Sequence, residues 1–427
     1  MKQFMTTILL SVISIFCVGA QITIEGCVEQ AQNHYPLVRK YDLLSVTGDI
    51  DLSDINKSWL PRIGVYGQLT GQNVVPSFPE TLTGVLRQMG QEMKGLGKIQ
   101  YKIGADITQT IWDGGASQVR RDMVRSQEET RRASLDVELY AVRHRVENLY
   151  FAILLTEEQI AQNCITYDLL MSNLGKLQAM LRNGTAMQSD ADMVEAQALT
   201  LRQAISAARS AVKGYRDVLA LFTGESLDGK MLARPAATEP VTNEPNRPEL
   251  RLFESRLRLN NLSDRLSDIS IMPKVGFFAQ AYYGYPGFDY FKSMIDRNMT
   301  FNILAGVKAT WNIDALYTRK NTSRRTQAES DNINADRDLF LFNCSLQSAS
   351  QRAAIDGIRD VMKEDSRIID LRANVRKAAE SQLANGIIDA TALLTKISDE
   401  NIARLTAQLH EIQLIQEIYQ LKYTLDR

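Results

Sequence analysis

The residues of this sequence whose types and spacing could do chemistry are carboxylates that follow two Asn-Gly pairs. Asp190 and Asp192 come after the pair at 183–184, and Asp389 comes after the pair at 385–386. If copies of the chain assemble around an axis, such carboxylates form acidic rings, which select cations in a narrow passage. Aspartate is also favoured in the first turn of a helix, where it binds free backbone N–H groups. Both interpretations, an acidic constriction and helix capping, remain open for these three residues.

A second group of charged residues lies in segments where apolar and polar residues alternate. These residues are Lys102, Asp106, Lys274 and Lys308. Alternation with a period of two places one set of side chains on each face of a β-strand. If the polar faces enclose a passage, the four charged side chains line it and influence which solutes pass. The alternative is that they are simply solvated.

Residues suited to catalysis or metal binding are few. The histidines are His34, His144 and His410. None of them has a partner at the spacing of a metal site or a catalytic triad. The cysteines after residue 20 show no CxxC or CxxH spacing, and they are Cys27, Cys164 and Cys344. This pattern indicates neither a disulfide framework nor a zinc site. We therefore expect no enzyme, no catalytic residue, no metal and no cofactor.

The composition narrows the class of protein further. The 427 residues include 49 basic and 50 acidic side chains, for a net charge of −1. Nucleic-acid-binding proteins usually carry a basic excess, so no nucleic-acid partner is expected. A mean hydropathy of −0.21 excludes a bundle of membrane-spanning helices.

Residues 1–20 have the pattern of a signal peptide. Lys2 precedes an apolar run, and Val18 and Ala20 are the small residues of a cleavage site. The run is shorter than the ~20 apolar residues that span a bilayer, which disfavours the alternative of an uncleaved anchor. The mature chain is expected to start at Gln21, outside the inner membrane.

The mature chain contains an internal repeat. Pro36 and Pro61 recur, 212 positions later, as Pro248 and Pro273, and the residues around each proline are similar. The repeat predicts a first half at 21–234, a linker at 235–247 and a second half at 248–427. Each half is expected to run helix, strand, loop, strand, very long helix, turn, helix.

Long helices are indicated by two tracts without proline, 80–234 and the chain after Pro286. In the first tract, Leu139, Val146 and Ile153 begin a series of apolar residues that recurs every seven positions, the pattern of a coiled coil. The predicted helices are 116–182, 188–222, 317–384 and 391–423. Glycine suits the left-handed position that ends a helix, so the Asn-Gly pairs predict the turns of two helical hairpins.

Strands are predicted at about 62–72, 101–112, 274–284 and 302–313. Their length is that of a tilted transmembrane β-strand. Four strands cannot close a barrel, and an open sheet edge is not tolerated in lipid, so the chain must assemble with copies of itself. Two copies supply eight strands and three copies supply twelve. The predicted fold class is mainly α with transmembrane β: long antiparallel coiled-coil hairpins plus four strands per chain. The connections at 72–100 and 284–299 are expected to be loops that face outside.

Three ordered motifs give the chain a resemblance to a known family. They are the helix starts Asn33-His34-Tyr35-Pro36-Leu37 and Asn246-Arg247-Pro248-Glu249-Leu250, the strand entries Leu60-Pro61 and Met272-Pro273, and the junction Gln109-Thr110-Ile111-Trp112-Asp113-Gly114-Gly115. Over nearly the whole mature chain the sequence resembles the TolC-like outer-membrane efflux proteins. The second junction, Trp311-Asn312-Ile313-Asp314, departs from the family pattern because it is one residue short and lacks Gly-Gly.

The resemblance implies a homotrimer with a twelve-stranded barrel in the outer-membrane lipid and a helical tunnel across the periplasm. It also implies docking to a periplasmic adaptor (a membrane fusion protein) and, through it, to an inner-membrane efflux pump. The implied docking tips are Asn183, Gly184, Thr185, Asn385, Gly386 and Ile387. Acidic gate residues in the family lie six and nine residues after the second turn glycine, where this chain has Ala392 and Thr395, whereas Asp190 holds the six-residue position of the first half.

The expected function is therefore that of a passive exit duct in a tripartite efflux or type I secretion system. The alternative is a secreted periplasmic or surface coiled-coil scaffold or adhesin. A scaffold explains the heptads, but it does not explain four barrel-length strands in duplicate. The exported substrate and the class of pump are not specified by any residue pattern.

Overall fold

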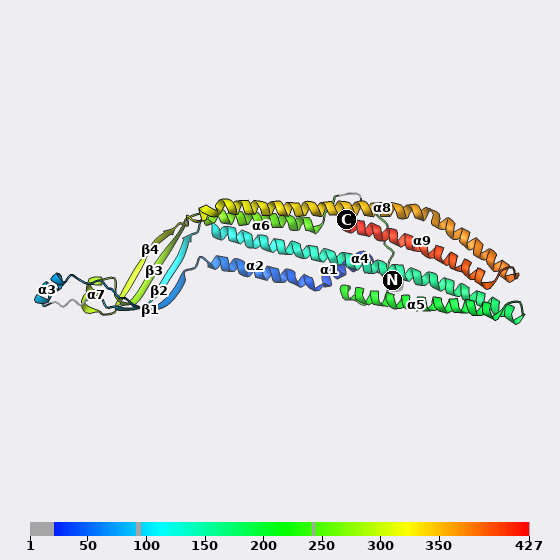
Figure 1. The fold of residues 1–427 in the computed structure, drawn as a ribbon, viewed down its shortest axis with the longest axis horizontal. Helices are drawn as coiled ribbons and strands as arrows, with labels where there is room; N and C mark the ends of the chain where they lie inside the picture. The colour runs from blue at the N-terminus through cyan, green and yellow to red at the C-terminus, as the bar shows by residue number, and fades with distance from the viewer. Residues whose placement is uncertain (1–20, 91–94, 241–243, 427) are drawn as a thin grey trace, which may run out of the picture. The chain divides into compact units, whose positions relative to one another are not determined.

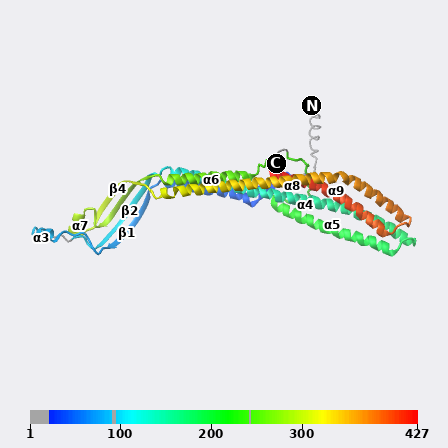
Figure 2. The same ribbon diagram turned by 45° about the horizontal axis from the view of Figure 1, so that its top comes forward.

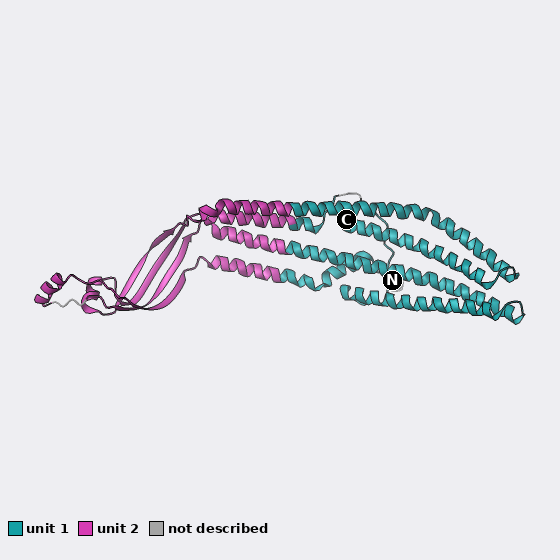
Figure 3. Cartoon of the chain, in the orientation of Figure 1, with its two compact units in different colours: residues 1–42, 132–252, 335–427 teal, residues 43–131, 253–334 magenta. Residues whose placement is uncertain are grey.

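The computed structural model describes residues 21–90, 95–240 and 244–426. The predicted signal peptide, residues 1–20, lies outside the described residues. The described chain forms two compact units (Figure 3). Unit 1 comprises the described residues up to 42 together with 132–252 and 335–427, and unit 2 comprises those within 43–131 and 253–334. Each unit therefore takes segments from both halves of the sequence.

From α2 and from α6 onward the elements follow the same order in the two halves of the chain, while α1 and a short 3-10 helix at Pro36–Val38 precede α2. The first half forms α1 (Ile24–His34), α2 (Arg39–Lys57), β1 (Arg62–Gly71), α3 (Glu80–Gln88), β2 (Ile99–Trp112), α4 (Ala116–Arg182) and α5 (Gln188–Thr223). The second half forms α6 (Pro248–Ser270), β3 (Lys274–Tyr285), α7 (Tyr290–Asp296), β4 (Thr300–Thr310), α8 (Ala315–Ala384) and α9 (Ala390–Leu425). No described helix is both long and apolar enough to cross a bilayer.

Unit 2 contains one antiparallel sheet in the order β1-β2-β3-β4 (Figure 1). Its register aligns the apolar residues of neighbouring strands: Ile63 pairs with Ile107, and Phe277 pairs with Val307. One face of the sheet is therefore apolar across all four strands, and this face is open, because Val65 on β1 is 78% exposed. Among the described residues, the edge strands β1 and β4 have no further strand partner.

In unit 2, α2 packs against α4, and α6 packs against α8. In each pair the two helices are joined along the chain by two strands of the sheet. Gly48 of α2 lies so close to α4 that an added Cβ would be 2.8 Å from Oε2 of Glu128. Asn260 of α6 donates a hydrogen bond to the carbonyl oxygen of Thr326 on α8 at 2.8 Å. Each strand pair is thus flanked by a short and a long helix from the same half of the sequence.

Unit 1 contains two helical hairpins, in which α5 runs back along α4 and α9 runs back along α8 (Figure 1, Figure 2). One apolar cluster joins the hairpins to α1 and includes Ile24, Val146, Tyr150, Ile153, Leu219, Ile412 and Tyr419. A second cluster lies nearer the helical turns and includes Leu170, Leu174, Leu177, Val194, Leu393 and Ile397. Val146, Ile153 and Leu174 come from the heptad series, whereas Tyr150 does not, so the period of the sequence accounts for part of the buried face.

The N-terminal segment is fastened to the chain near the end of the first half. Ile22 forms a parallel bridge with Leu232. The N–H of Ile22 donates to the carbonyl of Met231 at 3.0 Å, and the N–H of Ala233 donates to the carbonyl of Ile22 at 2.9 Å. The buried Tyr150 hydroxyl contacts both sides of the bridge, 2.7 Å from the carbonyl oxygen of Ile22 and 2.5 Å from that of Ala233.

The fourth strand is shorter at its end than predicted. It stops at Thr310 instead of continuing to 313, because Thr310 pairs with Lys274, the first residue of β3. The preceding Pro273 has no N–H to extend the ladder, so 311–313 have no strand to pair with. These residues form the turn into α8, without the glycines of the first junction, where Gly114 and Gly115 both adopt positive φ.

The two connections predicted as loops each contain a short helix, which corrects that prediction. The first is α3, whose apolar residues Leu82, Val85 and Leu86 have helical spacing. The second is α7, where the carboxylate of Asp289 caps the helix by accepting from the N–H of Lys292 at 2.9 Å. Proline at the start of the first segment and Asp289 in the second were the available signals.

Candidate functional site

The two hairpin turns of unit 1 are built in the same way. The N–H of Thr185 donates to the carbonyl of Met180 at 2.9 Å, and the N–H of Ile387 donates to the carbonyl of Gln382 at 2.9 Å. These bonds need a left-handed residue at the helix end, which is Gly184 in one turn and its counterpart in the other, with φ of 73° and 69°. All six predicted tip residues are exposed: Asn183, Gly184, Thr185, Asn385, Gly386 and Ile387.

Each predicted gate aspartate makes a local hydrogen bond at the start of a return helix. Asp389 is the N-cap of α9 and accepts from the N–H of Ala392 at 2.8 Å. Asp190 accepts from the N–H of Met187 at 3.0 Å, and Asp192 accepts from the side-chain amide of Gln188 at 2.7 Å. Asp389 and Asp190 thus bind backbone N–H groups as helix capping requires, whereas Asp192 binds only a side chain, and all three carboxylates remain wholly or partly open to solvent.

The starts of the two return helices meet. The hydroxyl of Thr391 on α9 lies 3.4 Å from the sulfur of Met193 on α5. Asp192 precedes Met193, and Asp389 lies two residues before Thr391, so residues predicted from separate halves belong to one end of unit 1. This juxtaposition is the geometry that an acidic ring would require from each copy.

On the sheet, two of the four predicted charged residues belong to one connected polar group. Nζ of Lys102 lies 5.7 Å from the ring centre of Tyr66 and 5.4 Å from that of Tyr282. The amide of Gln280 donates to the Tyr66 hydroxyl at 3.0 Å and to the carboxylate of Asp106 at 2.9 Å. Cation–π contacts and hydrogen bonds thus hold this group on the face opposite the apolar one.

The other two predicted residues, Lys274 and Lys308, lie further along the same polar face. Together with Arg62 they line a groove at the end of the sheet where β1 and β3 begin. Arg62 is not among the charged residues selected from the sequence, although its side chain lies on the same face as Lys274 and Lys308. Only the register of four strands brings the three cations to one groove.

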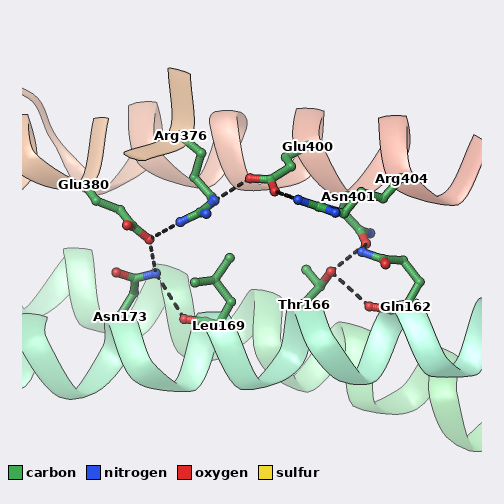
Figure 4. Close-up of polar contacts among 9 residues, drawn as sticks. All are labelled: Gln162, Thr166, Leu169, Asn173, Arg376, Glu380, Glu400, Asn401 and Arg404. Atoms are coloured by element: carbon green, nitrogen blue, oxygen red, sulfur yellow. Dashed lines mark hydrogen bonds and ion pairs between the residues drawn. The ribbon is translucent and has the colours of Figure 1, made fainter. Parts of the chain in front are cut away.

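A buried polar network between the hairpins of unit 1 was not predicted (Figure 4). The carboxylate of Glu400 on α9 accepts hydrogen bonds from Arg376 on α8 and, at 2.9 Å, from Arg404. Arg376 also donates to Glu380 at 2.8 Å, and Nδ2 of Asn173 on α4 lies 3.5 Å from the same carboxylate.

The network has a second contact between α4 and α9. The side-chain oxygen of Asn401 lies 3.1 Å from the amide nitrogen of Gln162 and 2.5 Å from the hydroxyl of Thr166 (Figure 4). Gln162, Thr166 and Asn173 are all buried, and buried polar groups left without partners are costly. The network therefore fixes how the second hairpin lies on the first.

Electrostatics of the network favour its charged form. Burial alone would raise the pKa of Glu400, but hydrogen bonds from Arg376 and Arg404 outweigh burial and lower the pKa of this carboxyl below its ordinary value. Burial would lower the pKa of Arg376, yet its bonds to Glu400 and Glu380 raise it. The pairing thus keeps a buried glutamate ionised at neutral pH.

The histidines take structural positions. His410 contacts Asp365 at 2.8 Å between α9 and α8, and the ring of His144 stacks on Tyr423 with 4.6 Å between centroids. Among residues 21–90, 95–240 and 244–426, no group of three or more His, Cys, Asp or Glu side chains is placed to hold a metal ion.

Comparison with solved structures identifies the fold. The outer-membrane channel OprN superposes with a TM-score of 0.69 at 13% identity, over 94% of this chain and 89% of that one. The outer membrane protein VceC from Vibrio cholerae gives 0.68 at 10% identity, over 94% and 95% of the two chains. The MtrE outer membrane channel of Neisseria gonorrhoeae gives 0.65 at 12% identity, over 94% and 88%. No protein-family model and no curated protein sequence matches the chain. The chain therefore has the fold of these channels, which confirms the predicted fold class.

Proposed function

We propose that the chain is the outer-membrane exit duct of an export system, in which three copies enclose one continuous passage. The observation that carries this proposal is the four-stranded sheet of unit 2. Its apolar face is open across all strands, with Val65, Val307 and Ile303 more than half exposed. In water such a surface favours association, whereas in a bilayer it is the face that meets lipid.

The edges of the sheet argue for assembly with further copies. Among the described residues, β1 and β4 lack an outer partner, and unpaired backbone groups are not tolerated within lipid. If β4 of one copy pairs with β1 of the next, three copies close a twelve-stranded barrel. The polar face carrying Lys102, Asp106, Lys274 and Lys308 then lines the lumen. Two copies would also pair every sheet edge, in a barrel of eight strands. The choice of three copies therefore rests on the family resemblance.

The helical hairpins supply the remainder of the duct. We propose that they form a tunnel in the periplasm and that their exposed turns dock the periplasmic adaptor, which connects the duct to an inner-membrane pump. The aspartates at the starts of α5 and α9 then ring the entrance, where three copies of each carboxylate favour cations. Conduction through the duct is passive, and the pump supplies the energy.

The structures that share this fold support the assignment. OprN and MtrE are outer-membrane channels, and so is a third protein of this fold, CmeC of Campylobacter jejuni. A coiled-coil scaffold would account for the hairpins, but it has no use for a sheet that exposes an apolar face.

Electron microscopy of the protein extracted from outer membranes in detergent tests the proposal. We expect hollow, tapered particles with threefold symmetry. Compact or filamentous particles without a barrel end would contradict the duct and favour the secreted scaffold. Fractionation gives an independent result: the duct needs detergent for release from the membrane, whereas a scaffold is removed by washing.

A further inference from the structure

The groove at the start of β1 and β3 has an unusual balance of charge. It is lined by Arg62, Lys274 and Lys308, and no aspartate or glutamate is among the described residues that line it. All three cations are exposed, and within the part of the chain that the structure describes none of them forms an ion pair. Other arginines of the chain do have a carboxylate partner, as Arg319 has in Asp264 at 3.1 Å. The groove thus presents positive charge that the monomer does not neutralise.

The sheet register explains why the cations meet. Lys274 is directly opposite Thr310, so Lys308, two residues earlier on β4, is its diagonal neighbour. Diagonal neighbours on one face are about 7–8 Å apart, within reach of the same small ligand. Arg62 joins them across β2, where its partner Thr108 also lines the groove.

The floor of the groove is suited to oxygen-rich anions. Gly276 is directly opposite Lys308 and two residues after Lys274, and a Cβ added to it would lie 2.9 Å from the carbonyl oxygen of Gln109, so a side chain here would crowd the hollow of about 240 Å³. Thr108, Thr110 and Thr310 line it and offer hydroxyl donors. Lysine, arginine and hydroxyl groups together are the donors that proteins use for phosphate and carboxylate oxygens.

The nearest acid on this face is occupied elsewhere. Asp106 is opposite Gln280 and accepts its hydrogen bond at 2.9 Å. Gln280 is four residues along β3 from Gly276, which is roughly 13 Å at ~3.3 Å per residue. Asp106 is, however, the diagonal neighbour of Arg62 at about 7–8 Å, so it offsets part of the charge of Arg62, while Lys274 and Lys308 lie further from it.

We propose that this groove is a binding site for small polyanions bearing phosphate or clustered carboxylate groups, and that anionic cargo is drawn through the barrel by it. The assignment of cargo rests on the proposed duct, since three copies bring nine cations around one lumen. The groove lies on the face opposite the apolar one, which places it toward the passage and away from lipid head groups.

Inorganic pyrophosphate is the probe for a direct binding test. Equilibrium dialysis of the full-length protein in detergent at low salt is compared for the natural chain and the Lys274→Gln/Lys308→Gln double variant. We expect the variant to bind about tenfold more weakly or worse, because two of three charge contacts are removed. Lys274→Arg/Lys308→Arg keeps the charge and retains binding. Lys292→Gln, which removes an exposed charge on α7, is the matched control and binds as the natural chain does.

A second measurement tests the consequence for transport. In planar bilayers with a KCl gradient, the double glutamine variant shifts the reversal potential toward that of potassium, and Lys292→Gln does not.

Equal pyrophosphate binding by the natural chain and the double glutamine variant overturns the site, even if hollow threefold particles form. Displacement of pyrophosphate by phosphatidylglycerol added to the micelles would mean that the groove takes lipid phosphate, which overturns the lumen assignment. A third outcome is that the natural chain binds pyrophosphate, the double glutamine variant does not, and the protein forms no hollow particles. That outcome would contradict the duct and the transport of anionic cargo, but it would support the anion-binding site.

Discussion

Glu400 of α9 is only 6% exposed, and its carboxylate accepts a hydrogen bond from Nε of Arg404 at 2.9 Å. Because Arg376 also donates to Glu400, replacing this glutamate leaves a half-buried arginine without its main partner. We expect Glu400→Ala to lower the free energy of unfolding by ~3 kcal/mol. Glu400→Gln, which keeps the shape and one acceptor, should cost about half as much. Thermal unfolding followed by circular dichroism measures both.

The control for this prediction is an exposed ion pair made by another glutamate of α9. Glu411 accepts from Arg234 at 2.7 Å, with both side chains about half exposed. Exposed ion pairs contribute about 0–1 kcal/mol, so Glu411→Ala should change the melting temperature little. Equal losses in the two variants would mean that burial adds nothing to the Glu400 network.

Acidification should weaken the same network. The pKa of Glu400 in the folded chain lies below the ordinary value of about 4.3. Its contribution to stability is therefore complete above that ordinary value and is lost as the pH falls through the lower folded pKa. Melting temperatures between pH 6 and pH 3 should converge for the natural chain and Glu400→Gln. A constant difference across this range would contradict the link to ionisation.

Asparagine and alanine at Asp389 separate capping from gating. Asparagine caps helices about as well as aspartate, so Asp389→Asn preserves stability, whereas Asp389→Ala loses a cap contribution of ~1 kcal/mol. If the carboxylates form a ring, both variants reduce cation selectivity in bilayer recordings. A reversal potential that Asp389→Asn leaves unchanged would reduce the role of Asp389 to capping.

The Tyr150 hydroxyl should matter for the anchoring of the N-terminal segment. Tyr150→Phe removes the donor to the carbonyls of Ile22 and Ala233 without changing the ring packing. The Ile22 carbonyl keeps the N–H of Ala233, whereas the Ala233 carbonyl loses the hydroxyl, at a cost of about 1–3 kcal/mol, mostly locally. We expect faster amide exchange at Ile22 and Ala233 and little change in the far hairpin turns. Uniformly faster exchange would instead indicate a global loss of stability.

Neighbouring residues on β1 test which face of the sheet meets lipid. Val65→Arg places a charge on the apolar face, at a cost of about 2–4 kcal/mol near the middle of a bilayer, and should deplete the protein from the outer-membrane fraction. Gly64→Arg points to the other face, opposite Asp106, where an added Cβ meets no atom within 4 Å. That variant should fractionate normally. The reverse outcome would mean that the polar face is the one in contact with lipid.

The features predicted best from the sequence are those set by local periodicity. The heptad through Val146 and Ile153 selects the face of α4 that is buried, and strict alternation locates all four strands within a few residues. The end of β4 was missed because it depends on where β3 begins, after Pro273, and not on residues 311–313 themselves. Helix α3 was missed because its short apolar spacing lies in a segment rich in glycine and polar residues.

The polar contacts between helices were beyond sequence reasoning for a different reason. Arg376 with Glu380, and Glu400 with Arg404, are visible as neighbours one turn apart on a helix. The contact between Arg376 and Glu400 depends on the axial register of α8 against α9, which the turn at Gly386 sets. The groove of Arg62, Lys274 and Lys308 likewise needs the register of three strand pairs, none of which a single strand specifies.

The bridge between Ile22 and Leu232 imposes an order on events during synthesis and folding. A polypeptide is synthesised from its N-terminus, so Ile22 is made long before Met231, Leu232 and Ala233, with which it forms the bridge. Until then Ile22 has no bridge partner, and α1 lacks the apolar surface of α5 that covers it. This segment of the chain is accordingly one that folding secures late.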